Sequence, residues 1–150
     1  MWTTADVLGK FRLGGELMTF VANRTEAGGC ATVGWDDEGI AATSYPIVNK
    51  GLFVSYQSAT REMIDLVAPI STLKKAPGHS YGQDWASIPF PRMPNVSLQP
   101  AARDISEDEV IAATDRGIYI DGDGSYSIDQ QRYNFQFGGQ TFWEIRNGKK

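Results

Sequence analysis

Hydrophobic and polar residues alternate most strictly near the C-terminal end of the chain. In residues 132–137, RYNFQF, three aromatic side chains alternate with polar ones, the period-two pattern of a strand that carries its aromatic residues on one face and its polar residues on the other. Two glycines follow and predict a turn, and residues 140–146 again have the pattern of a strand. Residues 118–129 contain two further short strand patterns around a Gly/Asp-rich turn. The last third of the chain is therefore expected to form four strands joined by tight turns.

The first two thirds contain weaker strand patterns. A hairpin is the clearest of them, because residues 43–48 and 52–56 flank Asn49-Lys50-Gly51, and Asn and Gly supply the positive φ that a tight turn needs. Pro46 lacks an N–H and indicates an edge strand. Three other segments are predicted strands: residues 17–22, 30–35 and 95–99.

Two short helices are expected between these strands. Ser106 and Glu109 have the spacing of a capping box, and Arg116-Gly117 has the composition of a helix end, so the best helix runs from about Glu107 to Arg116. A second helix is predicted from Ser58 to Leu66, followed by a long loop over residues 67–94, a length that is often functional. The predicted fold class is α+β, mainly antiparallel β-sheet with two short helices, in a single β-rich domain over residues 1–150.

Composition narrows the possible functions. The net charge is −4 and no cluster of Lys and Arg exceeds two residues, so direct nucleic-acid binding is not expected. No apolar run approaches the roughly 18 residues that span a bilayer, so no membrane association is expected. One cysteine, Cys30, excludes an internal disulfide and fits a cytoplasmic location. With a single histidine, His79, the chain cannot build a Cys/His zinc site, which takes three or four ligands.

Two polar groups are candidates for binding. Asp36-Asp37-Glu38 has the carboxylates of a metal or catalytic site, but Gly39 follows at once and a solvated turn is the default interpretation. Arg92 and Asn95, with the polar face of residues 132, 134 and 136, have side chains that can hydrogen-bond a peptide backbone or carboxylate. A network that caps the sheet is the alternative for this second group.

Seven segments that span most of the sequence occur together in a distinctive order: Trp35–Gly39, Ile47–Gly51, Trp85–Leu98, Gly117–Tyr119, Ser125–Asp129, Arg132–Gly138 and Trp143–Gly148. In these segments and their order the chain resembles the TldD/PmbA family of zinc metallopeptidases, also known as modulators of DNA gyrase, most closely its TldD-like branch. The chain departs from the family pattern at Tyr81, at Gln140 and at residues 121–124.

The resemblance implies a protease, a dimeric hydrolase that processes unfolded or extended peptides with a zinc ion held by an HExxxH helix and a distant cysteine. Neither motif occurs in these 150 residues, so the chain is expected to correspond to part of the family's C-terminal domain, with the zinc ligands placed before Met1 and beyond Lys150. No catalytic or metal-binding residue is expected here, and no cofactor for this chain alone. Whether the chain is itself an enzyme stays open.

In the complete enzyme, this part is expected to form a wall of the peptide cleft. The substrate-binding candidates are Trp85, Arg92 and Asn95. The expected partners are a peptide substrate and either further copies of the chain or the remainder of the full-length enzyme. Two alternatives stay open: a non-catalytic peptide-binding or assembly module that uses an exposed sheet edge, and a gyrase-associated regulator.

Overall fold

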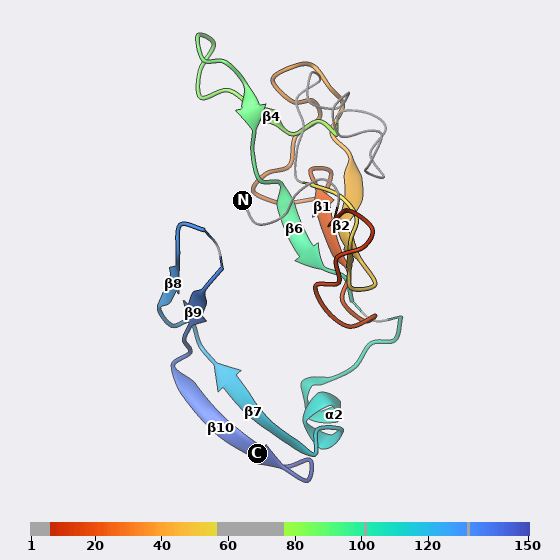
Figure 1. Cartoon of the computed structure of the whole chain (residues 1–150), viewed down its shortest axis with the longest axis vertical. Helices are drawn as coiled ribbons and strands as arrows, with labels where there is room; N and C mark the ends of the chain where they lie inside the picture. Colours follow the sequence, from red (N-terminus) through yellow and green to blue (C-terminus); the bar gives the residue numbers. More distant parts are fainter. Residues whose placement is uncertain (1–6, 57–76, 101, 132) are drawn as a thin grey trace. The chain divides into compact units, whose positions relative to one another are not determined.

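The computed structural model describes residues 7–56, 77–100, 102–131 and 133–150 (Figure 1). Contacts divide the chain into two compact units, one over Thr3–Gln99 and one that contains Pro100–Lys150. Each unit is described by itself below, and the single domain expected over residues 1–150 stays a prediction. The helix expected over residues 58–66 lies outside the described residues.

The N-terminal unit is built on a four-stranded antiparallel sheet with the strand order β3-β2-β1-β6. The buried hydrophobic residues of this unit include four from the sheet, Ala22, Tyr45, Val48 and Phe53, and Leu8 before it. The four strands have these bounds: β1 Phe20–Asn23, β2 Ser44–Asn49, β3 Leu52–Phe53 and β6 Asn95–Leu98.

The predicted hairpin forms as β2 and β3, but its positive φ angles fall on Lys50 (47°) and Gly51 (79°). Both central residues of the turn are thus left-handed, which matches the twist of the flanking strands. The edge position predicted from Pro46 is wrong, because β2 lies between β1 and β3. Pro46 is instead paired with Val21 where the register of β1 and β2 shifts, and such an irregularity tolerates a missing N–H.

The strand predicted over residues 30–35 does not form. Only Trp35 makes an isolated bridge, to Ala41, because the backbone before it is used in turns: Thr32 N donates to Gly29 O at 3.2 Å. Regular structure appears instead inside the predicted long loop. There, β4 (Ser80–Tyr81) and β5 (Phe90–Pro91) form a short antiparallel hairpin.

The C-terminal unit contains one described helix and the four predicted strands, which form two separate two-stranded antiparallel sheets. The strand pairs are β7 with β10 and β8 with β9 (Figure 1). Among the described residues, helix therefore contributes little and antiparallel sheet dominates, which confirms the predicted α+β class. The bounds are α2 Glu107–Ala112, β7 Arg116–Asp121, β8 Tyr126–Ile128, β9 Phe135–Phe137 and β10 Thr141–Arg146.

The capping box of α2 is confirmed. Glu109 N donates to the Ser106 hydroxyl at 3.2 Å, and Ser106 N donates to the Glu109 carboxylate at 2.8 Å. The predicted end at Arg116 is wrong, because the helix stops at Ala112. The chain turns after Ala112, and Gly148 N donates to Thr114 O at 3.0 Å. This bond connects the segment after the helix to the turn after β10.

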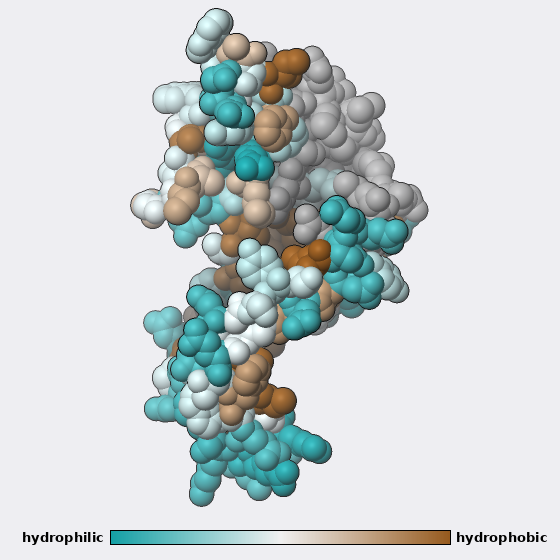
Figure 2. All heavy atoms as spheres, turned by 90° about the vertical axis from the view of Figure 1, so that its left-hand side faces the viewer, coloured by the Kyte–Doolittle hydropathy of each residue, from teal (hydrophilic) through white to brown (hydrophobic). Residues whose placement is uncertain are grey.

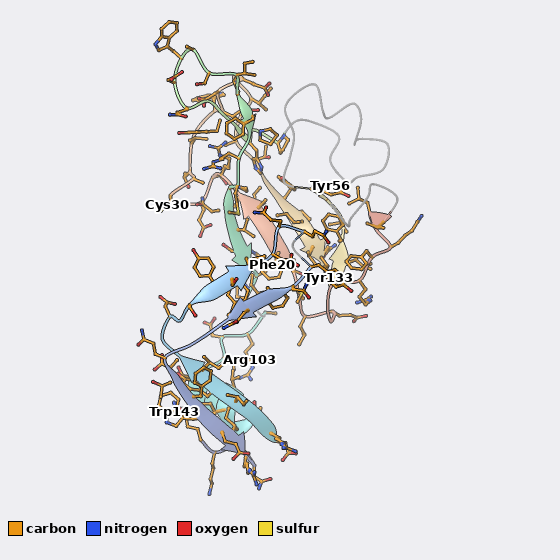
Figure 3. All side chains as sticks on the ribbon, turned by 60° about the vertical axis from the view of Figure 1, so that its left-hand side comes forward. Phe20, Cys30, Tyr56, Arg103, Tyr133 and Trp143 are labelled. Carbon is orange, nitrogen blue, oxygen red and sulfur yellow. The ribbon has the colours of Figure 1, made fainter. Side chains whose placement is uncertain are left out.

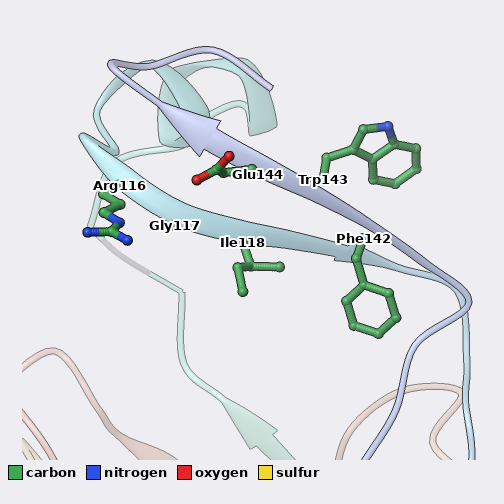
Figure 4. Close-up of a pocket in the computed structure, with 6 residues that line it drawn as sticks. All are labelled: Arg116, Gly117, Ile118, Phe142, Trp143 and Glu144. Carbon is green, nitrogen blue, oxygen red and sulfur yellow. The ribbon is translucent and has the colours of Figure 1, made fainter.

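The β7–β10 ribbon has one covered face and one open face. On the covered face Ile145 is buried and Lys150 Nζ lies 3.9 Å from the centre of the Tyr119 ring. The side chains of Ile118 and Phe142 project from the opposite face and are exposed (Figure 4). Hydrophobic residues also reach the surface elsewhere, as the brown spheres in Figure 2 show. The three aromatic side chains of the alternating segment, Tyr133, Phe135 and Phe137, are exposed as well.

Candidate functional site

The hairpin β4–β5 carries two of the three predicted site residues. Its own ladder is short, with the pairs Ser80 to Pro91 and Tyr81 to Phe90. The aromatic rings of the second pair meet edge to face at 6.3 Å. Directly after β5, Arg92 N donates to His79 O at 2.9 Å and extends the pairing.

The tip of this hairpin is a turn whose hydrogen bonds are made by Asp84. One carboxylate oxygen of Asp84 accepts from Ala86 N at 3.0 Å and from the Ser87 hydroxyl at 2.8 Å. These bonds, the Ser87 hydroxyl first, lower the pKa of Asp84, so this carboxylate is ionised at neutral pH. The turn displays Trp85, whose side chain is 99% exposed. An exposed indole on a fixed turn is a typical anchor for a binding partner.

A hollow of about 500 Å³ lies beside the tip. It combines two carboxylates, a hydroxyl and an indole, and it opens to solvent. Its lining residues are Asp37, Gly82, Asp84, Trp85, Ser87 and Pro89.

The acidic turn at residues 36–38 holds the hairpin from the other side. Asp36 is buried and accepts from Ser80 N at 3.0 Å. The Ser80 hydroxyl donates to Glu38 at 2.7 Å, and Gly82 N donates to Asp37 at 2.6 Å. The prediction of a solvated turn is therefore wrong for Asp36, because its carboxylate is the acceptor for backbone N–H groups that have left water. The sequence alone does not predict that these carboxylates hold the hairpin. The pattern that could have indicated it is the run of three successive carboxylates before Gly39.

Basic and aromatic groups complete the buried network. Arg24 is buried and donates to the carbonyl oxygens of Gly78 at 3.2 Å and Ser80 at 3.4 Å. His79 is fully buried, and its pKa is lowered to about 4, first by burial and then by the Arg24 guanidinium, against the opposing effect of Asp36. Burial also raises the pKa of Tyr45, whose hydroxyl lies 3.2 Å from His79 Nδ1. At neutral pH both rings are uncharged.

The third predicted site residue, Asn95, is not part of the hairpin. It lies at the start of β6 and is half-buried. Its oxygen accepts from Ala31 N at 3.0 Å, and its nitrogen donates to Asn23 O at 2.9 Å and to the Thr32 hydroxyl at 3.0 Å. The side chain thus holds the loop over residues 29–32, whereas Trp85 and Arg92 are exposed.

The polar face predicted on residues 132, 134 and 136 is only partly described. Residue 132 lies outside the described residues. Asn134 donates through its backbone and side-chain nitrogens to Asp129, at 3.1 and 2.9 Å. For Asn134 this geometry favours the capping alternative over a free peptide-binding amide.

The donor set of the described residues does not fit a zinc ion. Within residues 7–56, 77–100, 102–131 and 133–150, no group of three or more His, Cys, Asp and Glu side chains is arranged to hold a metal. His79 is enclosed in the core, and Cys30 is exposed on a surface loop (Figure 3). No catalytic step through zinc is therefore derived for these residues.

A second hollow, of about 370 Å³, lies on the β7–β10 ribbon (Figure 4). Its lining is mainly apolar, and Glu144 is its only carboxylate among the described residues. This composition suits a packing surface better than a catalytic one. The lining residues are Arg116, Gly117, Ile118, Phe142, Trp143 and Glu144.

None of the helices that the structure describes is long and apolar enough to cross a membrane.

Proteins with similar sequences are named as metalloproteases. One, from Methanocaldococcus jannaschii, is 26% identical over 144 residues, which are 96% of this chain and 30% of that protein. Another, from Methanothermobacter thermautotrophicus, is 26% identical over 122 residues, or 81% of this chain and 25% of that protein. The chain thus spans less than a third of the length of these relatives.

Solved structures show the same fold. TldE from Thermococcus kodakarensis superposes with a TM-score of 0.69 at 17% identity, over 95% of this chain and 30% of TldE. A protein described as a candidate modulator of a DNA gyrase from Thermotoga maritima gives a TM-score of 0.64 at 16% identity, over 95% of this chain and 30% of its own. The sequence also matches the profile of the PmbA/TldA metallopeptidase C-terminal domain over residues 3–150. Because that match covers nearly the whole sequence, the chain belongs to the PmbA/TldA (TldD/PmbA) family, as a portion of its C-terminal domain.

Proposed function

We propose that this chain is a β-rich C-terminal portion of a TldD/PmbA-type zinc metallopeptidase that acts on unfolded or extended peptides. The family membership and the metalloprotease names of the relatives support the reaction class. The chain spans 30% of the length of the first relative, so the proposed activity is that of a longer protein to which this chain contributes non-catalytic surface.

The single observation that carries the role of this portion is the exposure of Trp85. The Trp85 side chain is 99% exposed, and tryptophan is enriched among the residues that anchor binding interfaces. Its flat ring suits an extended peptide, and the guanidinium of the exposed Arg92, which lies 6.0 Å from the centre of the Phe90 ring, can bind a peptide carbonyl or carboxylate. Asn95 contributes indirectly, because it holds the neighbouring loop over residues 29–32.

The chain alone is expected to be inactive. In the family enzyme a zinc ion polarises the scissile carbonyl and activates water. The sequence contains one histidine and one cysteine, and His79 is buried as the neutral ring of a core contact with Tyr45. These residues do not replace the HExxxH helix and the distant cysteine.

The open face of the β7–β10 ribbon supports an assembly partner. Ile118, Ile120 and Phe142 are each more than half exposed, and such a face is stabilised by covering it. We propose that the remainder of the full-length enzyme or a second copy of the chain covers this face, in a dimeric protein of the cytoplasm.

A peptide titration tests the proposal. A fluorescent, unstructured peptide is titrated with the 150-residue chain and with the variants Trp85→Ala and Arg92→Ala, and anisotropy reports binding. Leu17→Ala is the matched control, because Leu17 is also almost fully exposed, at 96%. Binding that weakens for Trp85→Ala and Arg92→Ala but not for Leu17→Ala supports the proposal. Equal binding by all four proteins contradicts it.

A non-catalytic peptide-binding or assembly module is the first alternative, favoured by the unpaired outer edges of β7 and β10 among the described strands. It predicts peptide binding without metal and no cleavage even by the longer protein. A gyrase-associated regulator is the second, favoured by the description of the Thermotoga maritima protein. The net charge of −4 argues against direct DNA contact, and failure to retain gyrase subunits in a pull-down removes this alternative.

A further inference from the structure

The hairpin that displays Trp85 has little support from its own strands. Its ladder contains two residue pairs, and Pro91 in one of them has no N–H to donate. A two-stranded hairpin of this length is not stable by itself in water. Its position must therefore come from contacts to other parts of the N-terminal unit.

Those contacts come from the acidic turn at residues 36–38. The N–H groups of Ser80 and Gly82, two residues apart, point to the same side of β4 and donate to Asp36 and Asp37 at 3.0 and 2.6 Å. Between them, Asp37 N donates to Ser80 O at 3.4 Å. Two side-chain carboxylates thus take the places that backbone carbonyls occupy in a third strand.

The same turn reaches the hollow beside Trp85. Asp37 and Gly82, which are bonded to each other, line the hollow together with Asp84 and Trp85. The bond from Gly82 to Asp37 therefore joins the acidic turn to the lining of the hollow. Loss of this contact is expected to alter both the position of the hairpin and the shape of the hollow.

We propose that Asp36, Asp37 and Glu38 form a carboxylate clip that positions the Trp85 hairpin for peptide binding, with Asp37 as the positioning residue of the hollow. This inference rests on the proposed function for its peptide, but the clip itself is defined by contacts within the chain. The Ser80 hydroxyl bonded to Glu38 at 2.7 Å adds a buried anchor, since Ser80 is 1% exposed. Charge-assisted bonds of this kind are stronger than neutral ones and fix geometry.

The test compares Asp37→Ala with Asp37→Asn, whose amide oxygen still accepts the Gly82 N–H. Glu26→Ala is the control, because Glu26 is an exposed acidic residue away from the clip. Amide hydrogen exchange at Gly82 reports the clip, and the peptide titration reports binding. Asp37→Ala should accelerate exchange at Gly82 and weaken peptide binding about tenfold each, as expected for losing one charge-assisted bond. Asp37→Asn should recover most of both, and Glu26→Ala should change neither.

The outcomes separate this inference from the proposed function. If the unaltered chain binds peptide through Trp85 but Asp37→Ala changes neither exchange nor binding, the clip is overturned and the proposed function stands. If the unaltered chain binds no peptide, the proposed function fails, and with it the clip's role in peptide binding. Ser80→Ala is a second variant, which removes only the hydroxyl bond to Glu38. If the rate of amide exchange at Gly82 is unchanged in both Ser80→Ala and Asp37→Ala, the clip is also overturned.

Discussion

Nδ1 of His79 lies 3.2 Å from the hydroxyl oxygen of Tyr45, and the two rings are tilted at 33° with their centres 5.2 Å apart. Both side chains are buried, and among the described residues the other ring nitrogen of His79 has no hydrogen-bond partner. The imidazole is therefore accommodated as a neutral aromatic ring. Protonation would place a charge in a buried site close to the Arg24 guanidinium.

This burial predicts a pH-dependent stability. His79 has an ordinary pKa of 6.5 and a pKa of about 4 in the folded chain, so between these values the unfolded state binds more protons than the folded state. The free energy of unfolding should therefore fall as the pH falls from about 6.5 to about 4, by up to about 3 kcal/mol. Urea unfolding at a series of pH values measures this slope.

The control for the pH effect is His79→Asn, which removes the titrating ring. Its unfolding free energy should vary less between pH 6.5 and pH 4 than that of the unaltered chain, although its stability at pH 7 is lower because a buried contact is lost. An equal slope in both proteins would show that other groups control the acid response.

The Asn95 side chain predicts a loss of stability on truncation. Asn95→Ala removes three hydrogen bonds and leaves the N–H of Ala31 and the carbonyl of Asn23 without this partner. The cost should be about 1–3 kcal/mol in the free energy of unfolding. Asn95→Asp retains an acceptor for Ala31 but not the two donated bonds, so an intermediate value is expected. Chemical denaturation of the three proteins checks this order.

The contacts of Asn95 also illustrate which structural features the sequence predicts and which it does not. The strand predicted over residues 95–99 is confirmed as β6. The strand predicted over residues 30–35 does not form, and its Ala31 N–H donates to the Asn95 side chain, 64 residues away. Such a contact has no local signature, because strand propensity reflects the neighbourhood of a residue in the folded sheet.

Substitution of two glycines with nearly equal φ angles can distinguish the cost of a left-handed backbone from the cost of a steric clash. Gly51 has a φ of 79°, and a Cβ there would lie 2.2 Å from Gly14 O; Gly28 has a φ of 76° with open space around it. Gly28→Ala should cost about 1 kcal/mol, the conformational penalty alone. Gly51→Ala should cost about 1–3 kcal/mol more, because the backbone must move. If thermal unfolding shows similar losses of stability for Gly28→Ala and Gly51→Ala, the backbone of the β2–β3 turn can move to accommodate the added Cβ at little cost.

The capping box predicts local melting of α2. Ser106→Ala removes the acceptor of the Glu109 N–H and should destabilise the helix by about 1 kcal/mol. Ser106→Asn should retain most of the stability, since Asn is an equally good capping residue. Amide exchange at Glu109 measures the effect, and equal protection in Ser106→Ala and the unaltered chain would show that the cap is dispensable.

The candidate site was predicted less completely than the fold. The sequence places Trp85 and Arg92 in one predicted loop, and the structure places both on the β4–β5 hairpin with exposed side chains. The carboxylates that hold this hairpin have the local sequence of a solvated turn, because the burial of Asp36 depends on Ser80, 44 residues away. Period-two patterns specify strands, whereas buried polar networks depend on tertiary contacts that no short pattern records.

The most direct test of the central claim is the zinc content of the purified 150-residue chain, measured together with cleavage of an unstructured peptide, and compared with a version of the protein extended at both ends. The proposed function predicts stoichiometric zinc and cleavage only in the extended version. Stoichiometric zinc or cleavage by the 150-residue chain itself would contradict the assignment of this portion as non-catalytic, and would direct attention to His79 and Cys30.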